Sequence, residues 1–301
     1  MLGVPDRLRW LGFSQIVMLY ILENMASYLL IPNYNLIKYD LGVSDTYLGL
    51  LMGGFLLMNG FAALLWSYAS DAKGMRRKAL LSASLVGGGI FIVLASVSPN
   101  PILLIIFWVF SGGALGAIIP LGFSLISDLF DRHIRTKVFM LWYMLGGIGL
   151  ALGFGLALFL GTYYGWRLPL YVGGLILIFF GGPLSLLIWE PQRGFSDIDT
   201  PIDQYYYPYR FRPQDIGLIL SNKSNIYVAL QGFFGTIPNG VLFTWTVHYI
   251  IREANASEIA ASVFLGFMSV GALGGLVLSH ITDKLYRRNP TYRPLVAAFC
   301  S

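Results

Sequence analysis

Long apolar stretches separated by short polar segments run along most of the chain. A helix needs about 20 apolar residues to cross the hydrocarbon core of a bilayer. Evenly apolar runs of this length are typical of helices that pair their own backbone in lipid, not of barrel strands, so we predict an all-α integral membrane protein. A ninth run begins near Tyr292, and the sequence ends within it at Ser301. Eight complete spans are predicted, over residues 10–32, 46–70, 79–98, 101–127, 137–161, 168–189, 225–251 and 258–282.

The composition supports this class. Charged residues make up 12% of the 301 residues and hydrophobic residues 56%, whereas a soluble domain has about 25% charged residues. The formal net charge of +5 does not indicate a nucleic-acid partner, because the basic residues lie in short loops and form no continuous face. The single cysteine, Cys300, forms no internal disulfide and fits no metal-ligand spacing.

The first apolar run could be mistaken for a secretion signal, because Arg7 and Arg9 precede it. However, Glu23 and Asn24 follow, apolar character then resumes as far as Pro32, and no small-residue cleavage site closes the run. We interpret it as an uncleaved first span.

The basic residues lie almost entirely on one side of the predicted topology. With the N-terminus inside, the outside segments hold only Lys38, Arg167 and Arg252, which leaves 17 of the 20 Lys and Arg residues inside. Loops rich in Lys and Arg face the cytoplasm. We therefore expect a multi-pass protein of the cell membrane with a cytoplasmic N-terminus.

A polar segment divides the predicted spans into two groups. Residues 190–224 contain four prolines and the aromatic run Tyr205–Tyr207. We expect a six-helix transmembrane half over 1–189, a cytoplasmic linker over 190–224 and the start of a second half over 225–301. The linker could rest on the membrane surface through its tyrosines, or it could be a disordered loop.

A short motif recurs at the ends of the second and eighth predicted spans, as expected for two related halves. In each copy a serine precedes an aspartate by four residues, and a pair of arginines follows. The two copies consist of Ser67, Asp71, Gly74, Arg76 and Arg77, and of Ser279, Asp283, Lys284, Arg287 and Arg288.

This repeat resembles the loop signature of the major facilitator superfamily, Gly-x-x-x-Asp-(Arg/Lys)-x-Gly-(Arg/Lys)-(Arg/Lys). The two serines replace the opening glycine, Ala72 replaces a basic residue, and Met75 stands where an arginine is usual. Three further segments resemble the spinster-like branch of that superfamily: Ile126–Phe130 with Arg135, Gly165–Arg167 and Glu190–Gly194.

The resemblance implies a bundle of twelve spans in two halves, with the solute bound between them and exposed to each side in turn. It also implies that the two motif loops are gating loops, in which Asp71 stabilises one conformation through a neighbouring helix N-terminus and the arginines lie at the anionic lipid surface. The alternative is that these charges only set the orientation of the chain in the membrane. Because the sequence ends in its ninth span, we expect the 301 residues to be a fragment of such a protein.

Glu23 is the carboxylate that lies deep in a predicted span. A charge there is costly, so such residues normally face the bundle interior. Tyr20, Glu23 and Ser27 share one helix face, with Asn24 beside it. Burial favours a protonated carboxyl group, so Glu23 is a candidate proton carrier; the alternative is a neutral, structural glutamate. Spinster-like relatives have Asn-Tyr-Met-Asp-Arg on this helix, and the Asp-Arg pair is absent here.

The seventh predicted span offers two further candidates for the cavity, Gln231 and Asn239. Pro238 should break or kink this helix, and interrupted spans often build substrate sites. His248, toward its outer end, is more typical of an interface residue than of a ligand.

Small residues at four-residue spacing on the fifth span, Gly149, Gly153, Ala157 and Gly161, predict close packing of a neighbouring helix. Gly112, Gly116 and Pro120 on the fourth span indicate the same. Trp142 and Tyr143 are interpreted as aromatic residues of the membrane interface rather than substrate contacts.

The sequence contains no Walker-type nucleotide loop, no His-Glu-x-x-His and no Gly-x-Ser-x-Gly. We expect neither an enzyme nor a cofactor. The preferred function is a secondary active or facilitative transporter of a small organic solute, and the spinster-like resemblance implies a lipid-derived solute or an organic anion. The expected partners are the lipid bilayer, the solute and, through Glu23, protons. An intramembrane enzyme, or a receptor or assembly protein on the same fold, is the alternative.

Overall fold

The computed structural model describes residues 6–197, 213–254 and 260. The chain divides into two compact units, Met1–Phe211 and Arg212–Ser301, each of which is described by itself. The secondary structure of the described residues consists of helices. The first unit contains α1 (Asp6–Ser27), η1 (Ile31–Asn33), α2 (Tyr34–Leu41), α3 (Asp45–Asp71), α4 (Arg77–Ser96), α5 (Pro101–Leu115), α6 (Ile118–Leu129), α7 (Arg132–Tyr164), α8 (Arg167–Ile176), the π-helical η2 (Leu177–Gly181), α9 (Gly182–Leu186) and η3 (Phe195–Asp197).

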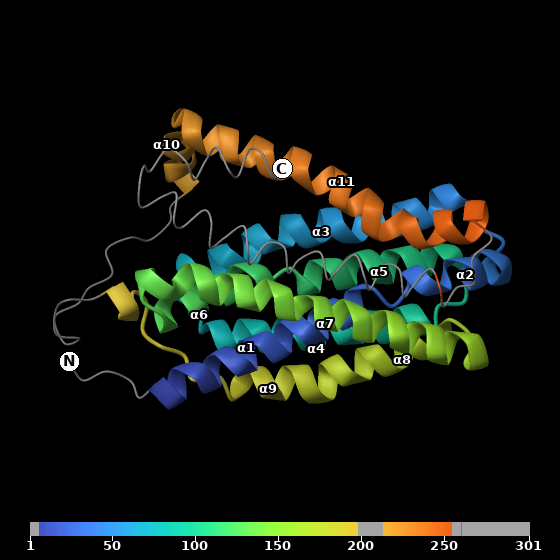
Figure 1. Ribbon diagram of the computed structural model, residues 1–301, viewed down its shortest axis with the longest axis horizontal. Coiled ribbons are helices and arrows are strands. Elements are labelled where there is room, and N and C mark those ends of the chain that lie inside the picture. Colours follow the sequence, from blue (N-terminus) through green and yellow to red (C-terminus); the bar gives the residue numbers. More distant parts are fainter. Residues whose placement is uncertain (1–5, 198–212, 255–259, 261–301) are drawn as a thin grey trace. The chain divides into compact units, whose positions relative to one another are not determined.

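Six helical segments of the first unit are long and apolar enough to cross a membrane, and they match the first six predicted spans. Within the bundle α1 packs on α7, α3 on α5, and α4 on α5, α8 and α9 (Figure 1). The protein is therefore a multi-pass helical membrane protein. The six segments are Asp6–Leu41, Asp45–Asp71, Arg77–Ser96, Pro101–Leu129, Ile134–Tyr164 and Arg167–Leu186.

Prolines account for interruptions in two of these spans. The turn at Gly116 and Ala117 separates α5 from α6, and Pro120 follows in the first turn of α6. The π-helical turn η2 lies directly before α9, whose second residue is Pro183. A proline has no N–H to donate and its ring clashes with the carbonyl group four residues earlier, so the helix changes its hydrogen-bonding pattern just before each ring.

The predicted small-residue ladder on the fifth span is confirmed as a packing surface. A Cβ atom added at Gly149 or Gly153 of α7 would lie 2.3 Å from a backbone oxygen of α1, that of Ile21 or Met25 respectively. Further along, the Asn33 side chain donates a hydrogen bond to the Ala157 carbonyl oxygen at 3.2 Å. Glycine is required because it lets the two backbones approach this closely.

Gly112 and Gly116 form a corresponding contact between α5 and α3. A Cβ atom added at these positions would lie 2.4 Å from the Phe55 carbonyl oxygen and 2.5 Å from that of Asn59. The packing role predicted for these two glycines is therefore also confirmed.

The described part of the second unit contains η5 (Pro213–Asp215), α10 (Ile216–Ser221) and α11 (Lys223–Ala254). Helix α11 covers the seventh predicted span, although it is not one of the six segments that meet the length and apolarity needed to cross a membrane. It runs without interruption through position 238, so the break predicted at Pro238 is not present. The eighth and ninth predicted spans lie outside the described residues.

Candidate functional site

The motif loop between α3 and α4 lies at one end of the six-helix unit, which we call the Arg77 end. Gly74 has φ of 65°, a left-handed conformation that a residue with a side chain rarely adopts. This turn reverses the chain between Asp71, the last residue of α3, and Arg77, the first residue of α4. The glycine of the motif is thus needed to bring the two charged positions to the same end of the bundle.

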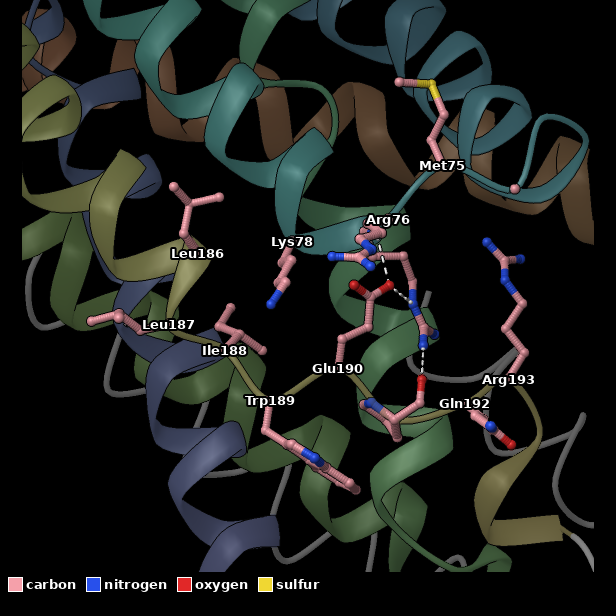
Figure 2. Close-up of a pocket in the computed structure, with 13 residues that line it drawn as sticks. Met75, Arg76, Lys78, Leu186, Leu187, Ile188, Trp189, Glu190, Gln192 and Arg193 are labelled. Atoms are coloured by element: carbon pink, nitrogen blue, oxygen red, sulfur yellow. Dashed lines mark hydrogen bonds and ion pairs between the residues drawn. The ribbon is translucent and has the colours of Figure 1, made fainter. Parts of the chain in front are cut away.

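Arg77 is buried, with 1% of its side chain exposed. Its guanidinium group forms ion pairs with Asp128 at the end of α6 and with Glu190 just after α9, and it donates to the Pro191 carbonyl oxygen at 2.7 Å. The Arg77 backbone N–H donates to the same Glu190 carboxylate at 2.8 Å (Figure 2). Arg77, Asp128 and Glu190, which we call the Arg77 cluster, therefore join α4, α6 and the segment after α9.

The segment after α9 docks further on α6. The Gly194 N–H donates to the Asp128 carboxylate at 2.8 Å, and the Ser196 hydroxyl donates to the Ser127 carbonyl oxygen at 2.6 Å. Arg135 of α7 donates to the same Ser127 oxygen at 2.8 Å. The first residues of the predicted linker are thus held against the six-helix unit.

Asp71 has a different partner from Arg77. It forms an ion pair with Arg193, and the side chains of Arg193 and Asp71 are 28% and 47% exposed. Arg193 also donates to the Ser70 carbonyl oxygen at 2.6 Å and to the Ser70 hydroxyl oxygen at 2.8 Å. Asp71 therefore connects the end of α3 to the segment after α9.

The structure separates the two arginines of the motif. Arg76 is exposed, whereas Arg77 is buried and paired with two carboxylates. The sequence interpretation missed the partners of Arg77, which lie 51 and 113 residues away. Their signal was present as acidic residues at the ends of the fourth and sixth spans. The second copy of the motif, Asp283, Lys284, Arg287 and Arg288, lies outside the described residues.

The predicted polar face of the first span is brought together as expected. Glu23 is 8% exposed. Its carboxylate accepts hydrogen bonds from the Ser27 hydroxyl at 2.9 Å and from the Asn24 side chain at 3.2 Å. The Asn24 side chain also donates to the Tyr20 carbonyl oxygen at 2.9 Å. No described cation forms an ion pair with Glu23.

Aromatic side chains surround this polar face. The ring of Tyr20 lies 4.6 Å from that of Trp142 and 6.2 Å from that of Tyr143, measured between centroids. Trp142 is fully buried, against Gly122 of α6, so its interpretation as a residue of the membrane interface is wrong. The sequence does not reveal that the Trp142 side chain is buried between helices. Tyr143 is half-exposed.

The other two cavity candidates belong to the second unit. Gln231 is exposed on α11, and the side chain of Asn239 lies outside the described residues, as does that of His248. In the described residues, no group of three or more His, Cys, Asp or Glu could hold a metal ion.

Six apolar spans, with a buried charged cluster that joins α4, α6 and the segment after α9, define a polytopic helical membrane bundle. The sequence profile of the Major Facilitator Superfamily matches residues 16–301. The chain belongs to this superfamily.

Two curated relatives and one solved structure bear on the spinster-like resemblance. The protein named spinster from Drosophila melanogaster is 27% identical over 190 residues, which is 58% of this chain and 30% of that protein. The sphingosine-1-phosphate transporter SPNS2 from Danio rerio is 24% identical over 289 residues, 87% of this chain and 54% of that protein. This chain thus spans only part of the length of either relative.

The solved structure is that of a bacterial homologue of the human lysosomal transporter Spinster, in an inward-facing, unoccupied conformation. It is 19% identical to this chain with a TM-score of 0.71, and the match covers 95% of this chain and 64% of that one. At this identity the match establishes the fold. Together with the spinster relative, it confirms the predicted spinster-like resemblance.

Proposed function

We propose that the protein is a secondary active or facilitative transporter that moves a small organic solute across the membrane by alternating access. The observation that carries this proposal is the superfamily match over residues 16–301, within which relatives and structural neighbours are named as transporters. Transport as the function also implies that the protein is not an enzyme.

The loop charges favour an orientation in the cell membrane with the N-terminus and the Arg77 end at the cytoplasmic face. Residues 1–189 would form the first half of the transporter, 190–224 the linker and 225–301 the start of the second half. Asp71, Gly74, Arg76 and Arg77, with Asp283, Lys284, Arg287 and Arg288, would form the two gating loops.

Glu23 is the residue we assign to proton coupling. It is buried, and its hydrogen-bonding partners are a hydroxyl and an amide, with no described cation to neutralise it. A carboxylate in such surroundings is costly to keep charged. Proton binding would therefore depend on whether Glu23 faces water, which changes between the two conformations of an alternating-access transporter. Tyr20 and Asn24, and from the second half Gln231 and Asn239, would line the cavity beside it.

The solute proposed is amphipathic, either lipid-derived or an organic anion. The name of the SPNS2 relative, a sphingosine-1-phosphate transporter, supports a lipid-derived anion. The aromatic rings of Tyr20 and Tyr143 beside Glu23 provide apolar contact area for the hydrophobic part of such a solute.

Uptake into proteoliposomes tests the proposal. The whole protein would be reconstituted and given a pH gradient with sphingosine-1-phosphate and a set of aromatic carboxylic acids. Wild type should take up at least one solute in a pH-dependent manner, and Glu23→Gln should lose that dependence. Asp6→Asn removes an exposed carboxylate from the same helix and should behave as wild type.

Two outcomes would contradict parts of this proposal. Unchanged pH dependence in Glu23→Gln would make Glu23 structural. A solute that binds to the purified protein but never enters a sealed vesicle would favour the second candidate, a non-transporting receptor on a transporter fold.

A further inference from the structure

A cavity of about 620 Å³ lies between the start of α4 and the end of α9 at the Arg77 end. Its lining includes residues 74–78 on one side and 186–193 on the other. Figure 2 shows Arg76, Lys78, Trp189 and Glu190 around this space. A cavity of this size is large enough for a small organic group.

The charges that line the cavity are not balanced. Arg77 pairs with both Asp128 and Glu190, and Arg193 pairs with Asp71, so these two arginines and their three carboxylates carry one net negative charge. Arg76 and Lys78 form no ion pair or side-chain hydrogen bond with any residue that the structure describes.

The acidic group in the lining, Glu190, is already engaged by the Arg77 backbone and side chain. Its carboxylate is therefore already paired with Arg77. Arg76, the residue just before α4, and Lys78, in its first turn, have no ion-pair partner among the described residues, so the lining and its partners together carry one net positive charge.

The opposite side of the cavity begins with accessible apolar side chains. Leu186 and Leu187, at the end of the sixth span, are 50% and 71% exposed. Trp189 follows them, partly exposed, and its ring packs edge-on against Phe195 at 6.0 Å between centroids. Tryptophan is enriched at the level of the lipid headgroups. The cavity thus combines unpaired cations with apolar side chains at the end of a membrane span.

We propose that this cavity binds a phosphate-bearing anion through Arg76 and Lys78. Basic pockets between transmembrane helices at the cytoplasmic side attract phosphate headgroups of anionic lipids, and a guanidinium group can donate two hydrogen bonds to one phosphate. A phospholipid headgroup would place its acyl chains along Leu186 and Leu187. A soluble phosphate would contact the same two cations but not the two leucines.

Bound lipid can be measured by native mass spectrometry on the whole protein purified from vesicles of phosphatidylglycerol and phosphatidylcholine. Wild type should retain phosphatidylglycerol in preference to phosphatidylcholine. The double variant Arg76→Gln/Lys78→Gln should retain less, by roughly fivefold for each cation removed. Lys73→Gln, an exposed cation of the same loop outside the cavity lining, is the matched control and should retain as much as wild type.

A second arm identifies the source of the phosphate. Delipidated protein in detergent would be heated with and without inorganic phosphate. If phosphate raises the melting temperature of wild type but not of the double variant, and phosphatidylglycerol is not preferred, the site takes a soluble phosphate and the proposal holds. If phosphatidylglycerol is retained through Arg76 and Lys78 and inorganic phosphate has no effect, the site takes a lipid headgroup.

Equal behaviour of wild type and the double variant toward both lipid and phosphate would overturn the proposal. An equal loss of lipid in Lys73→Gln would also overturn it, because it would assign the effect to general surface charge. Neither measurement depends on transport, so the result stands apart from that of the uptake experiment.

Discussion

The two ends of the six-helix unit are both held by ion pairs, but the pairs differ in burial. At the Arg77 end the arginine is 1% exposed and contacts two carboxylates. At the opposite end, which we call the Asp40 end, Arg167 pairs with Asp40 at 2.5 Å, with 40% and 48% of the side chains exposed. Asp40 also accepts a hydrogen bond from the Trp166 indole N–H at 3.0 Å.

The same chemistry therefore has different consequences at the two ends. Removing one partner of a buried pair leaves an uncompensated charge and costs about 3–5 kcal/mol, whereas an exposed pair contributes about 0.2–1 kcal/mol. The Arg77 end should be a fixed structural element of the first unit. The Asp40 end should tolerate substitution and respond to salt.

The largest expected effect is that of Arg77→Met, compared with the identical change Arg167→Met. Loss of the buried guanidinium leaves Asp128 and Glu190 without a cation, so the free energy of unfolding should fall by about 3–5 kcal/mol. Arg167→Met should lower it by less than about 1 kcal/mol. Denaturant unfolding in detergent measures both.

A rescue experiment checks the cause of that loss. Adding Asp128→Asn and Glu190→Gln to Arg77→Met removes the stranded carboxylates, so much of the stability should return. If Arg77→Met lowers the free energy of unfolding no more than Arg167→Met does, then burial does not make the ion pairs at the two ends differ in strength.

The second-largest expected effect on stability concerns helix packing away from the Arg77 end. Gly153→Ala places a methyl group 2.3 Å from the Met25 backbone oxygen, and overpacking of this kind costs about 1–3 kcal/mol. Gly155→Ala, on the same helix, meets nothing within 4 Å and should be neutral or slightly stabilising. Thermal unfolding of the two variants side by side measures the difference, and equal melting temperatures would contradict the close contact of α1 and α7.

A smaller effect is expected from Arg193→Gln, because the Asp71–Arg193 pair is partly exposed. The loss of stability should be about 1 kcal/mol. It should lie between the losses in Arg77→Met and Arg167→Met in the same unfolding assay. A loss as large as that in Arg77→Met would mean that Arg193 belongs to the buried network.

The smallest effect is the response to salt. At 1 M salt the Debye length is about 3 Å, so exposed pairs are screened and buried pairs much less. The stability difference between wild type and Arg167→Met should disappear at 1 M NaCl, while that between wild type and Arg77→Met should persist. A buried-pair difference that vanishes with salt would show that water reaches Arg77.

The sequence predicted the six described spans and the close approach of α1 and α7, because span length, apolarity and four-residue spacing of small residues are local properties. It also predicted that Glu23, Ser27 and Asn24 lie together on one helix. It did not predict the partners of Arg77 or the burial of Trp142. These depend on which helices become neighbours, and nothing in a single span records that.

Helix interruptions were also difficult to predict. Pro120 and Pro183 follow changes in the helical pattern, whereas α11 continues through Pro238. A proline near the start of a helix is tolerated because its missing N–H has no partner there anyway. The effect of a proline within a helix depends on whether the local hydrogen bonds can rearrange around it.

Tracer counterflow in sealed proteoliposomes most directly tests whether the protein moves a solute rather than only binding it. Vesicles containing the whole protein would be loaded with unlabelled solute and diluted into a trace of the labelled one. A transporter exchanges the two, so label should accumulate transiently inside vesicles with wild type and not inside empty vesicles. Saturable binding of the solute to the purified protein, without any transient accumulation of label, would contradict transport.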